Sequence, residues 1–401
     1  MLVVTLLGKI GFMIDQKPVA IPAPSLLEPL VRLACTNEPI ELEMPKEQGV
    51  FAPYLEQMPS GAWRLECASD VLLYYATTDL KTLHRQKAIL APDCPSVSAE
   101  FDRWLEAERF AVHLHFLKVL LENTQGLLEA SRLPEAQKNI EYVEREAQSQ
   151  KPNFAAQVWL ELGKFYHRLN RLAEAATHFE TGLALLAPAE QASAKVNYAA
   201  ILVRLGRLEQ ALSALEPLPD GEAQGFALLH QANALWFLGR LPEARASAEA
   251  AFQAAKASED GFLAMSAKTL IGEVLLTQAK ATQSEPKEAA IVLGQAIGIA
   301  EVLSEEASAL TLAVLAEVHL LWGAKQKALE MAEKAYKRAR AAKDPTATIR
   351  SLLSLYGITK IGSFAHNALK EAQAVTHKPL ELVAVGLVAE VKIKEQKRNP
   401  N

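Results

Sequence analysis

A chain of 401 residues, 50% hydrophobic and 22% charged, is too long for one ordinary compact domain and predicts a small domain followed by an elongated array. Its net charge of -5, from 42 basic and 47 acidic residues, excludes a chain-wide electrostatic hold on phosphate backbones. The apolar stretch 382–389 is too short to cross a bilayer, and no export signal or membrane anchor is visible. Three cysteines without C-x-x-C spacing predict reduced thiols in the cytoplasm rather than disulfides or a zinc site.

The first 90 residues, 1–90, are expected to form a small α+β domain. Short apolar runs rich in β-branched residues predict strands, and recurring apolar residues predict one helix despite Pro29. A helical pattern resumes after Asp70. In chain order, the predicted elements are strands at 2–7 and 10–14, a turn at 15–18 before the apolar residues 19–21, a helix at 25–34, a turn at 59–61 and a strand at 62–66.

The break Ala91-Pro92-Asp93-Cys94-Pro95 is the predicted domain boundary. Beyond it the chain is predicted to be helical throughout, so that the whole is mainly α. We expect a first helix pair at 96–150, a solenoid with a capping helix at 151–391, and a fraying tail at 392–401.

A repeated segment organises this helical region. SRLPEAQ, NRLAEAA, GRLEQAL and GRLPEAR share one alanine, and three weaker copies follow. Successive copies of this alanine lie 33 to 45 residues apart. That period predicts an α-solenoid of about seven helix pairs. Each junction has a chain-reversing Gly, Asn or Ser, and the alanine is expected where the two helices approach closely. The shared alanines are Ala136, Ala175, Ala211, Ala244, Ala289, Ala328 and Ala368.

One of these repeats resembles the tetratricopeptide repeat family. The segment WLELGKFYHRLNRLAEAATHFETGLALLAP has the residue types of that motif at the spacings of the motif, and a proline ends its second helix. The other repeats are similar to the family in period and apolar pattern. The matching positions are Trp159, Leu162, Gly163, Tyr166, Ala175, Phe179 and Pro188.

The order of the N-terminal elements carries a second resemblance. With GAWRL in the last strand and FDRWLEAER at 101–109, it resembles the bacterial transcriptional activator family of the Streptomyces antibiotic regulatory protein type. That resemblance implies a winged-helix DNA-binding domain in front of a tetratricopeptide-like activator domain. It also implies a role in transcription regulation.

The stretch between Ile40 and Gly61 departs from that family. Prolines at 45, 53 and 59 leave a longest proline-free piece of seven residues, 46–52. A recognition helix needs about 10 residues to reach base edges in the major groove. The segment 36–66 also holds six acidic residues against two basic ones. We therefore expect a degenerate winged-helix-like domain whose recognition helix is missing.

A solenoid of this type presents a concave groove lined by the first helix of each pair. Superposing the Trp159 repeat on its successors places six polar side chains on that inner side, where they are predicted to hold the backbone or carboxylates of an extended peptide. Leu160 stands where the peptide-carboxylate clamp of some tetratricopeptide proteins presents lysine. The predicted groove residues are Lys164, Arg168, Asn197, Arg204, His230 and Asn233.

No motif in the sequence predicts catalytic residues, a cofactor or a metal site, so we expect no enzymatic activity. His113 and His115 lie two apart on a helix and point to different sides, while His84 and Cys94 come without a partner motif. A basic run and an aromatic pair each allow two interpretations. The run 333–344 is a basic patch or a solvated helix end, and Trp236 with Phe237 are ligand anchors or packing residues.

Two functions follow. The first is a non-enzymatic, transcription-related regulator that acts in the cytoplasm as a protein-binding tetratricopeptide scaffold. The alternative is a DNA-binding transcriptional activator that uses its N-terminal winged domain. There a shortened winged domain, the hairpin around Trp63 and Arg64, or a dimer supplies the DNA contacts. The sequence leaves DNA binding and homo-oligomerisation open.

Overall fold

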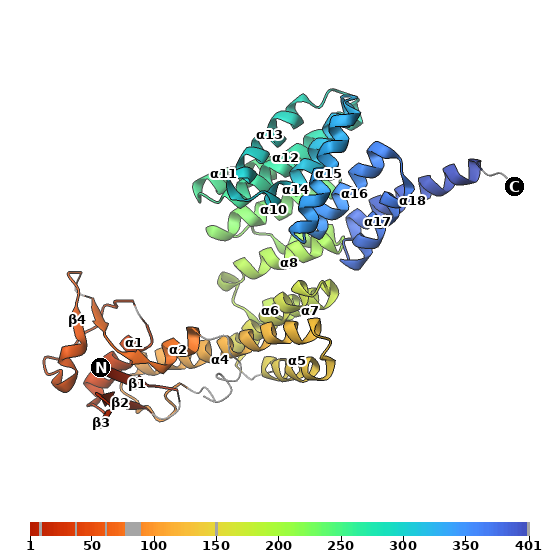
Figure 1. Ribbon diagram of the computed structural model, residues 1–401. Helices are drawn as coiled ribbons and strands as arrows, with labels where there is room; N and C mark the ends of the chain where they lie inside the picture. The colour runs from red at the N-terminus through yellow and green to blue at the C-terminus, as the bar shows by residue number, and fades with distance from the viewer. Residues whose placement is uncertain (8–9, 37, 61, 77–89, 149–150, 399–401) are drawn as a thin grey trace. The chain divides into compact units, whose positions relative to one another are not determined.

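The computed structural model describes residues 1–401 except 8–9, 37, 61, 77–89, 149–150 and 399–401 (Figure 1). The chain divides into two compact units, Met1–Phe165 and Tyr166–Asn401. The division falls inside helix α6, Pro152–Arg168. The break predicted at 91–95 therefore lies within the first unit.

The first unit opens with a mixed four-stranded sheet in the order β3-β2-β1-β6. β1 runs antiparallel to β2 and parallel to β6, which the sequence did not predict. Asp15 and Gln16, both at positive φ, make the β2–β3 turn, so the turn predicted through Pro18 is wrong in its extent. Pro18 lies in edge strand β3, where a missing N–H costs no ladder bond. The strands are β1 Leu2–Thr5, β2 Gly11–Ile14, β3 Lys17–Val19 and β6 Ala68–Ser69.

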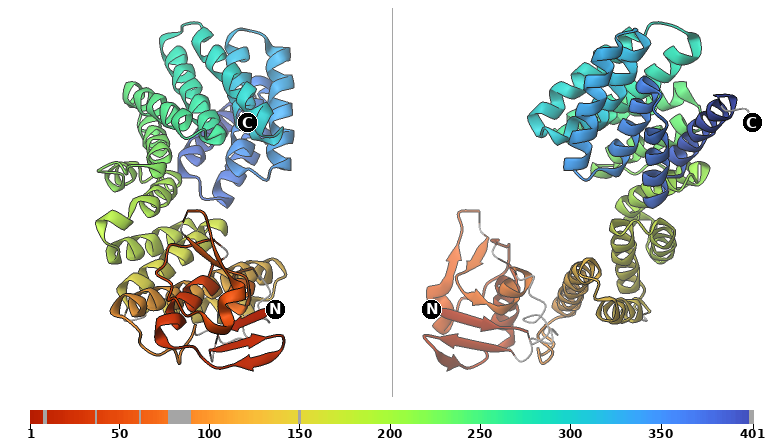
Figure 2. Two further views of the ribbon diagram at one scale, coloured as in Figure 1. Left: turned by 90° about the vertical axis from the view of Figure 1, so that its left-hand side faces the viewer. Right: turned by 45° about the vertical axis from the view of Figure 1, so that its right-hand side comes forward.

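The predicted helix is present as α1, Pro24–Ala34, and buries its apolar face against this sheet. Between α1 and the hairpin that follows it, the described residues contain one 3₁₀ helix, Gly49–Tyr54, and no α-helix. The hairpin pairs β4, Leu55–Gln57, with β5, Trp63–Leu65, and stands apart from the β1–β3 strands (Figure 2). A six-residue 3₁₀ helix is too short to span a major groove.

The FDRWLEAER motif joins the sheet to the helical region. Phe101 and Trp104 of α4, Ala99–Glu129, stack on each other at 5.6 Å, and the Arg32 guanidinium of α1 lies 5.3 Å from the Trp104 ring. Arg109 donates to the carbonyls of Leu90 and Ala91. These contacts give the motif a structural role. α2, Asp70–Ala76, and α5, Leu133–Ala147, complete the unit.

Seven successive helix pairs, α4–α5 to α16–α17, and a final helix α18 make up the rest of the described chain, which confirms the mainly α solenoid behind a small α+β domain (Figure 1). All seven shared alanines are at most 1% exposed, so they mark the close approach of helices as expected. The remaining helices are α7 Leu172–Leu185, α8 Ala192–Arg204, α9 Leu208–Ala214, α10 Glu222–Phe237, α11 Leu241–Ala257, α12 Gly261–Thr282, α13 Lys287–Leu303, α14 Ala309–Leu321, α15 Lys325–Ala341, α16 Pro345–Thr359, α17 Gly362–Ala374 and α18 Lys378–Arg398.

The junctions also follow the predicted chemistry. Ser131, Asn170, Gly206 and Gly239 all adopt positive φ, between 57° and 78°, and reverse the chain between the two helices of a pair. Glycine and asparagine tolerate this conformation best, which explains their recurrence. Among the described residues, no helix combines the length and apolar character that crossing a membrane requires.

Candidate binding surface on the first helices

The first helices of the pairs line the inner side of the curve in the second unit. Arg350 of α16 reaches Glu273 of α12, two pairs earlier, with Glu317 of α14 between them. Side chains can span three successive pairs only on the side toward which the stack curves. The inner surface is therefore formed by α8, α10, α12, α14 and α16.

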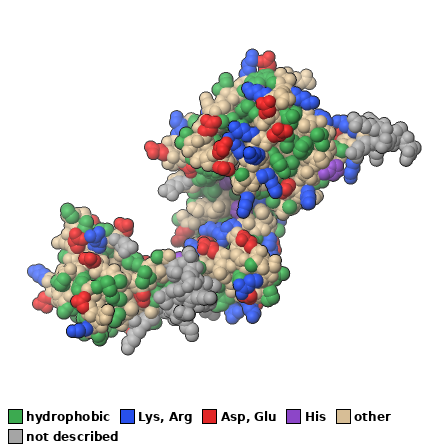
Figure 3. Space-filling view, viewed as in Figure 1, with side chains coloured by type: hydrophobic (Ala, Val, Ile, Leu, Met, Phe, Trp, Pro, Cys, Tyr) green, Lys and Arg blue, Asp and Glu red, His purple; other side chains and the backbone are tan. Residues whose placement is uncertain are grey.

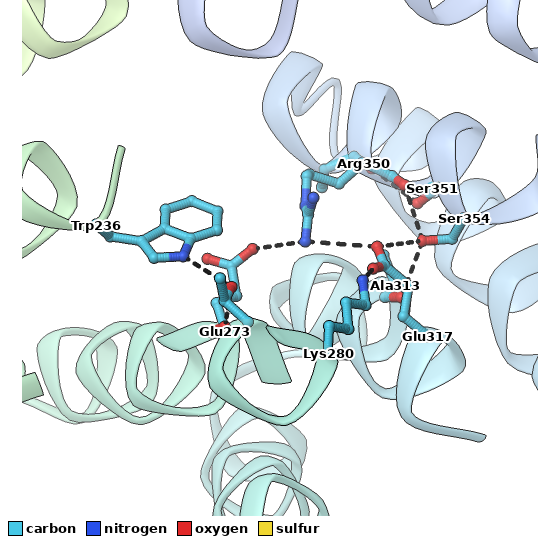
Figure 4. A network of polar contacts seen from close by, with 10 residues as sticks. Trp236, Glu273, Lys280, Ala313, Glu317, Arg350, Ser351 and Ser354 are labelled. Atoms are coloured by element: carbon cyan, nitrogen blue, oxygen red, sulfur yellow. Dashed lines mark hydrogen bonds and ion pairs between the residues drawn. The ribbon is translucent and has the colours of Figure 1, made fainter. Parts of the chain in front are cut away.

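A network of charged and polar groups crosses this surface (Figure 4). Arg350 Nη2 lies 3.0 Å from the Glu273 carboxylate and 3.5 Å from that of Glu317. Glu317 also accepts from Lys280 and, at 3.1 Å, from the Ser354 hydroxyl. The network ties α12, α14 and α16 together with two acids and two bases, so it is neutral.

An aromatic residue closes one end of the network. Trp236 Nε1 donates to the Thr277 hydroxyl at 3.1 Å, and the Arg350 guanidinium lies 5.8 Å from the Trp236 ring. Phe237 lies next to it at 4.6 Å between ring centroids and packs in the apolar cluster of α16 to α18. These contacts support the packing interpretation of the two aromatics.

The charges in this network have shifted pKa values with distinct causes. Burial raises the pKa of Glu273, and Arg350 only partly offsets it. Burial would also raise the pKa of Glu317, but Arg350 and Lys280 together hold it below its ordinary value. The Arg350 pKa is raised because the two carboxylates outweigh its own burial. Arg350 therefore stays positively charged, and its removal would leave the Glu273 carboxyl buried without a cation.

A second cluster surrounds Arg204 at the end of α8. Its guanidinium donates to Asn170 Oδ1 and to the Val375 carbonyl, both at 2.9 Å, and lies 3.3 Å from His167 Nε2. Its Nε has no hydrogen-bond partner, and no carboxylate of the described residues pairs with it. The Val375 carbonyl ends α17, so the negative end of a helix dipole faces the guanidinium, and the Asp344 carboxylate acts on it beyond ion-pair distance.

Histidines around Arg204 are held in the neutral form. Burial lowers the pKa of His377 to about 4, and Arg204 contributes further. Burial and then Arg204 likewise lower the pKa of His167, and burial lowers that of His230. His377 Nδ1 accepts from the Leu380 N–H at 3.4 Å and so caps the start of α18.

The structure places the six predicted groove residues in different settings. Lys164 lies in the first unit and pairs with Glu161 at 2.8 Å. Arg168 is exposed, whereas Arg204 and His230 belong to the half-buried cluster just described. Asn197 and Asn233 donate to carbonyls of their own helices at 3.1 Å. Lys164 and Arg168 lie on α6, and the other four residues lie on α8 and α10, where Arg204 makes an internal contact.

The residues that the DNA-binding alternative would use are engaged within the hairpin. Arg64 lies 2.5 Å from the Glu56 carboxylate, and the Trp63 backbone bonds to Ile40 in both directions. In the basic run 333–344, Arg338 pairs with Glu305 and Arg340 with Glu371. Figure 3 shows basic and acidic side chains intermixed on the visible face of the second unit, which favours the solvated-helix interpretation of that run.

The other candidate residues have separate surroundings in the described part of the chain. His113 lies 3.6 Å from Glu146, and His115 packs against Tyr75 at 5.3 Å. His84 lies outside the described residues. No described group of three or more His, Cys, Asp or Glu has metal-site geometry.

Sequence reasoning missed the Arg350 network, although a signal was present. Glu273, Glu317 and Arg350 each stand alone in an apolar run, in TLIGEVLL, VLAEVHLL and TIRSLLSL. A single charge at a helix position that faces the core needs a partner from another element. On this basis the two isolated acids and the isolated arginine could have been predicted to form ion pairs with one another.

Comparisons with known proteins agree on the repeat type. A tetratricopeptide repeat family model matches residues 156–181, 192–217 and 225–250. No curated protein matches the sequence. The chain thus carries tetratricopeptide-type repeats from residue 156 onward, within a solenoid that extends beyond the matched segments.

Several solved structures resemble this chain at TM-scores below 0.5. A Rap protein in complex with Competence and Sporulation Factor has 12% identity and a TM-score of 0.48 over 82% of this chain and 98% of its own. Aspartyl phosphate phosphatase F from Bacillus subtilis has 12% identity and a TM-score of 0.46 over 81% and 92%. A signal transduction ATPase with a tetratricopeptide repeat sensor from Pyrococcus horikoshii has 14% identity and a TM-score of 0.45 over 94% and 65%. Likenesses at this level assign no function.

Proposed function

We propose that this chain is a non-enzymatic, transcription-related regulator that binds an acidic segment of a protein partner along the first helices of its solenoid. The observation that carries the proposal is a row of polar side chains on the first helices α6, α8 and α10. In this row Arg168 and Arg204 have no ion pair with a described carboxylate, whereas Lys164 pairs with Glu161. Arg168 is exposed without an ion pair among the described residues, and Arg204 meets only neutral acceptors. A carboxylate from a partner would supply the missing counter-charge.

Asparagines on the same helices suit the backbone of such a segment. Asn197 and Asn233 each use the side-chain N–H₂ within their own helix, so the amide oxygens have no hydrogen bond among the described residues. An extended peptide offers N–H groups that these oxygens can accept. The expected ligand is therefore an extended, acidic peptide segment.

The transcription setting rests on the N-terminal unit. Its sheet, single helix, hairpin and following FDRWLEAER motif are the elements on which the sequence resemblance to the activator family rests. The absence of an α-helix between α1 and the hairpin in the described residues supports a regulator that acts without a recognition helix. DNA binding through Trp63 and Arg64 gains no support, because Arg64 is neutralised by Glu56.

Affinity purification of the full chain from its own cells tests the proposal. We expect one stoichiometric protein to be retained, and we expect Lys164→Glu combined with Arg168→Glu to release it. Lys327→Glu combined with Lys334→Glu is the matched control, since both lysines are exposed on a second helix, α15. If the first double reversal leaves the complex intact, the assignment of the binding surface is wrong.

A further inference from the structure

A shallow apolar groove lies between the second helices α11 and α13 and the start of the first helix α12, apart from the Arg350 and Arg204 clusters. It has a volume of about 520 Å³ and is bounded by the C-terminal halves of α11 and α13 and the first turns of α12. Nothing in the proposed function uses it. Its lining residues are Phe252, Gly261, Lys268, Gln295, Gly298, Ile299, Val302 and Leu303.

Large apolar side chains in and beside this groove face water. Val302 is 86% exposed and Leu303 44%, while Phe262 at the start of α12 is 56% exposed. Ile291 continues the same apolar surface along α13 and is 63% exposed. Clustered exposure of this size marks a surface that is covered by another molecule.

Two glycines leave the backbone of α13 bare on the same face. Gly294 and Gly298 follow Ile291 at helical spacing and precede Val302, and all four positions are exposed. A Cβ added at either glycine would meet no atom within 4 Å, so no packing inside the chain explains them. Glycine in a helix interior costs stability relative to alanine. A bare helix face allows the backbone of a second helix to approach closely.

Two lysines lie at the groove, and the exposed acid Glu301 stands next to Val302 on α13. Lys268 Nζ lies 4.2 Å from the Phe252 ring and donates to Gln295 at 2.8 Å, and Lys256 Nζ lies 5.9 Å from the same ring. Neither lysine forms an ion pair with a described carboxylate. Asp260, the acid at the start of α12, accepts from the Leu263 N–H as the helix cap.

We propose that this groove docks an amphipathic helix of a protein partner, with acidic residues beside its apolar face. The apolar floor would cover the leucine-type face of that helix, the α13 glycines would admit its backbone, and Lys256 and Lys268 would pair with its carboxylates. The groove shares no residue with the first-helix surface, so either proposal can fail without the other.

Fluorescence anisotropy with two labelled model peptides tests this docking. Both are amphipathic helices of about 14 residues, roughly four turns, one built from leucine, alanine and glutamate and one from leucine, alanine and lysine. We expect the full chain to bind the glutamate peptide at least about tenfold more tightly than the lysine peptide. Lys268→Glu is expected to reverse that preference, because the charge swap restores pairing with the lysine peptide.

Gly298→Leu separates docking from folding. Leucine favours the helix and fills the groove, so the variant is expected to fold and to lose the glutamate peptide. Gly386→Leu is the matched control, an exposed glycine of α18 with no atom within 4 Å of an added Cβ. The Lys164→Glu, Arg168→Glu chain is expected to bind as the unaltered chain does.

Three results would overturn the docking proposal. The first is that neither peptide binds. The second is that both bind equally with no effect of Lys268→Glu, which would mean unspecific apolar contact. The third is a dimer in sedimentation that Gly298→Leu dissociates, because the groove would then hold a second copy of this chain.

Discussion

Replacing Arg350 with methionine is expected to lower the free energy of unfolding by about 3–5 kcal/mol. Methionine keeps most of the apolar stem but removes the guanidinium that pairs with Glu273 and Glu317. Glu273 is only 5% exposed, so its carboxyl would remain buried without its cation. Two effects make up this loss in stability: the Glu273 carboxyl is buried without a counter-charge, and the ion pairs that join α12, α14 and α16 are lost.

Urea unfolding followed by circular dichroism measures this loss. Adding Glu273→Gln to Arg350→Met is expected to recover part of it, since the amide is cheaper to bury than the charge. Arg340→Met is the matched control, because Arg340 pairs with Glu371 on the exposed side of α15 and should cost less than about 1 kcal/mol. Equal losses in the two single variants would show that the Arg350 network does not hold the pairs together.

Acidification is expected to destabilise the second unit between pH 6.5 and about 4. Burial lowers the pKa of His377 from 6.5 to about 4, so in this window the unfolded chain binds a proton that the folded chain does not. The stabilisation is complete above pH 6.5 and is lost as the pH falls toward 4. For His377, which is 5% exposed, the loss amounts to about 3 kcal/mol at most, and His167 and His230 act in the same direction.

Denaturation midpoints measured across this pH range test the assignment. His377→Asn removes the titrating group but keeps a side chain that caps a helix start, so it should flatten the acid slope without unfolding the chain. His366→Asn, at an exposed position of α17, is expected to leave the slope unchanged. An unchanged slope in the His377 variant would contradict the account of this cluster.

Much of the architecture was predictable because it depends on local chemistry. The seven alanines marked the close approaches within helix pairs, and the reversing residues at 131, 170, 206 and 239 marked the turns between their helices. Both signals act over a few residues and repeat, so one sequence contains them several times. Short N-terminal strands were predicted from β-branched runs, but β6, two residues long, gave no pattern to detect.

The candidate binding surface was predictable only in part, because contacts between distant pairs depend on the curvature of the stack. Arg204 ends the first helix α8, and its bond to the Val375 carbonyl joins residues 171 apart in the chain. No repeat pattern contains that separation. The same holds for Arg350 and Glu273, whose meeting requires three pairs to curve by a definite amount.

The apolar groove beside α13 could not be predicted from the sequence for a different reason. The glycines of α13 and the exposed Val302 are plain in the sequence, yet helical spacing alone does not tell which face of a second helix is covered by its neighbours. Packing of α11 and α12 against α13 decides this, and it leaves the face with Gly294 and Gly298 open.

Titration of the full chain into labelled duplex DNA, followed by anisotropy at two salt concentrations, tests the central claim most directly. A regulator that acts through protein binding, without a recognition helix and with Arg64 paired to Glu56, is expected to bind duplex DNA weakly at both concentrations. Tight binding that falls steeply with salt would contradict the claim and would restore the winged domain as the functional site.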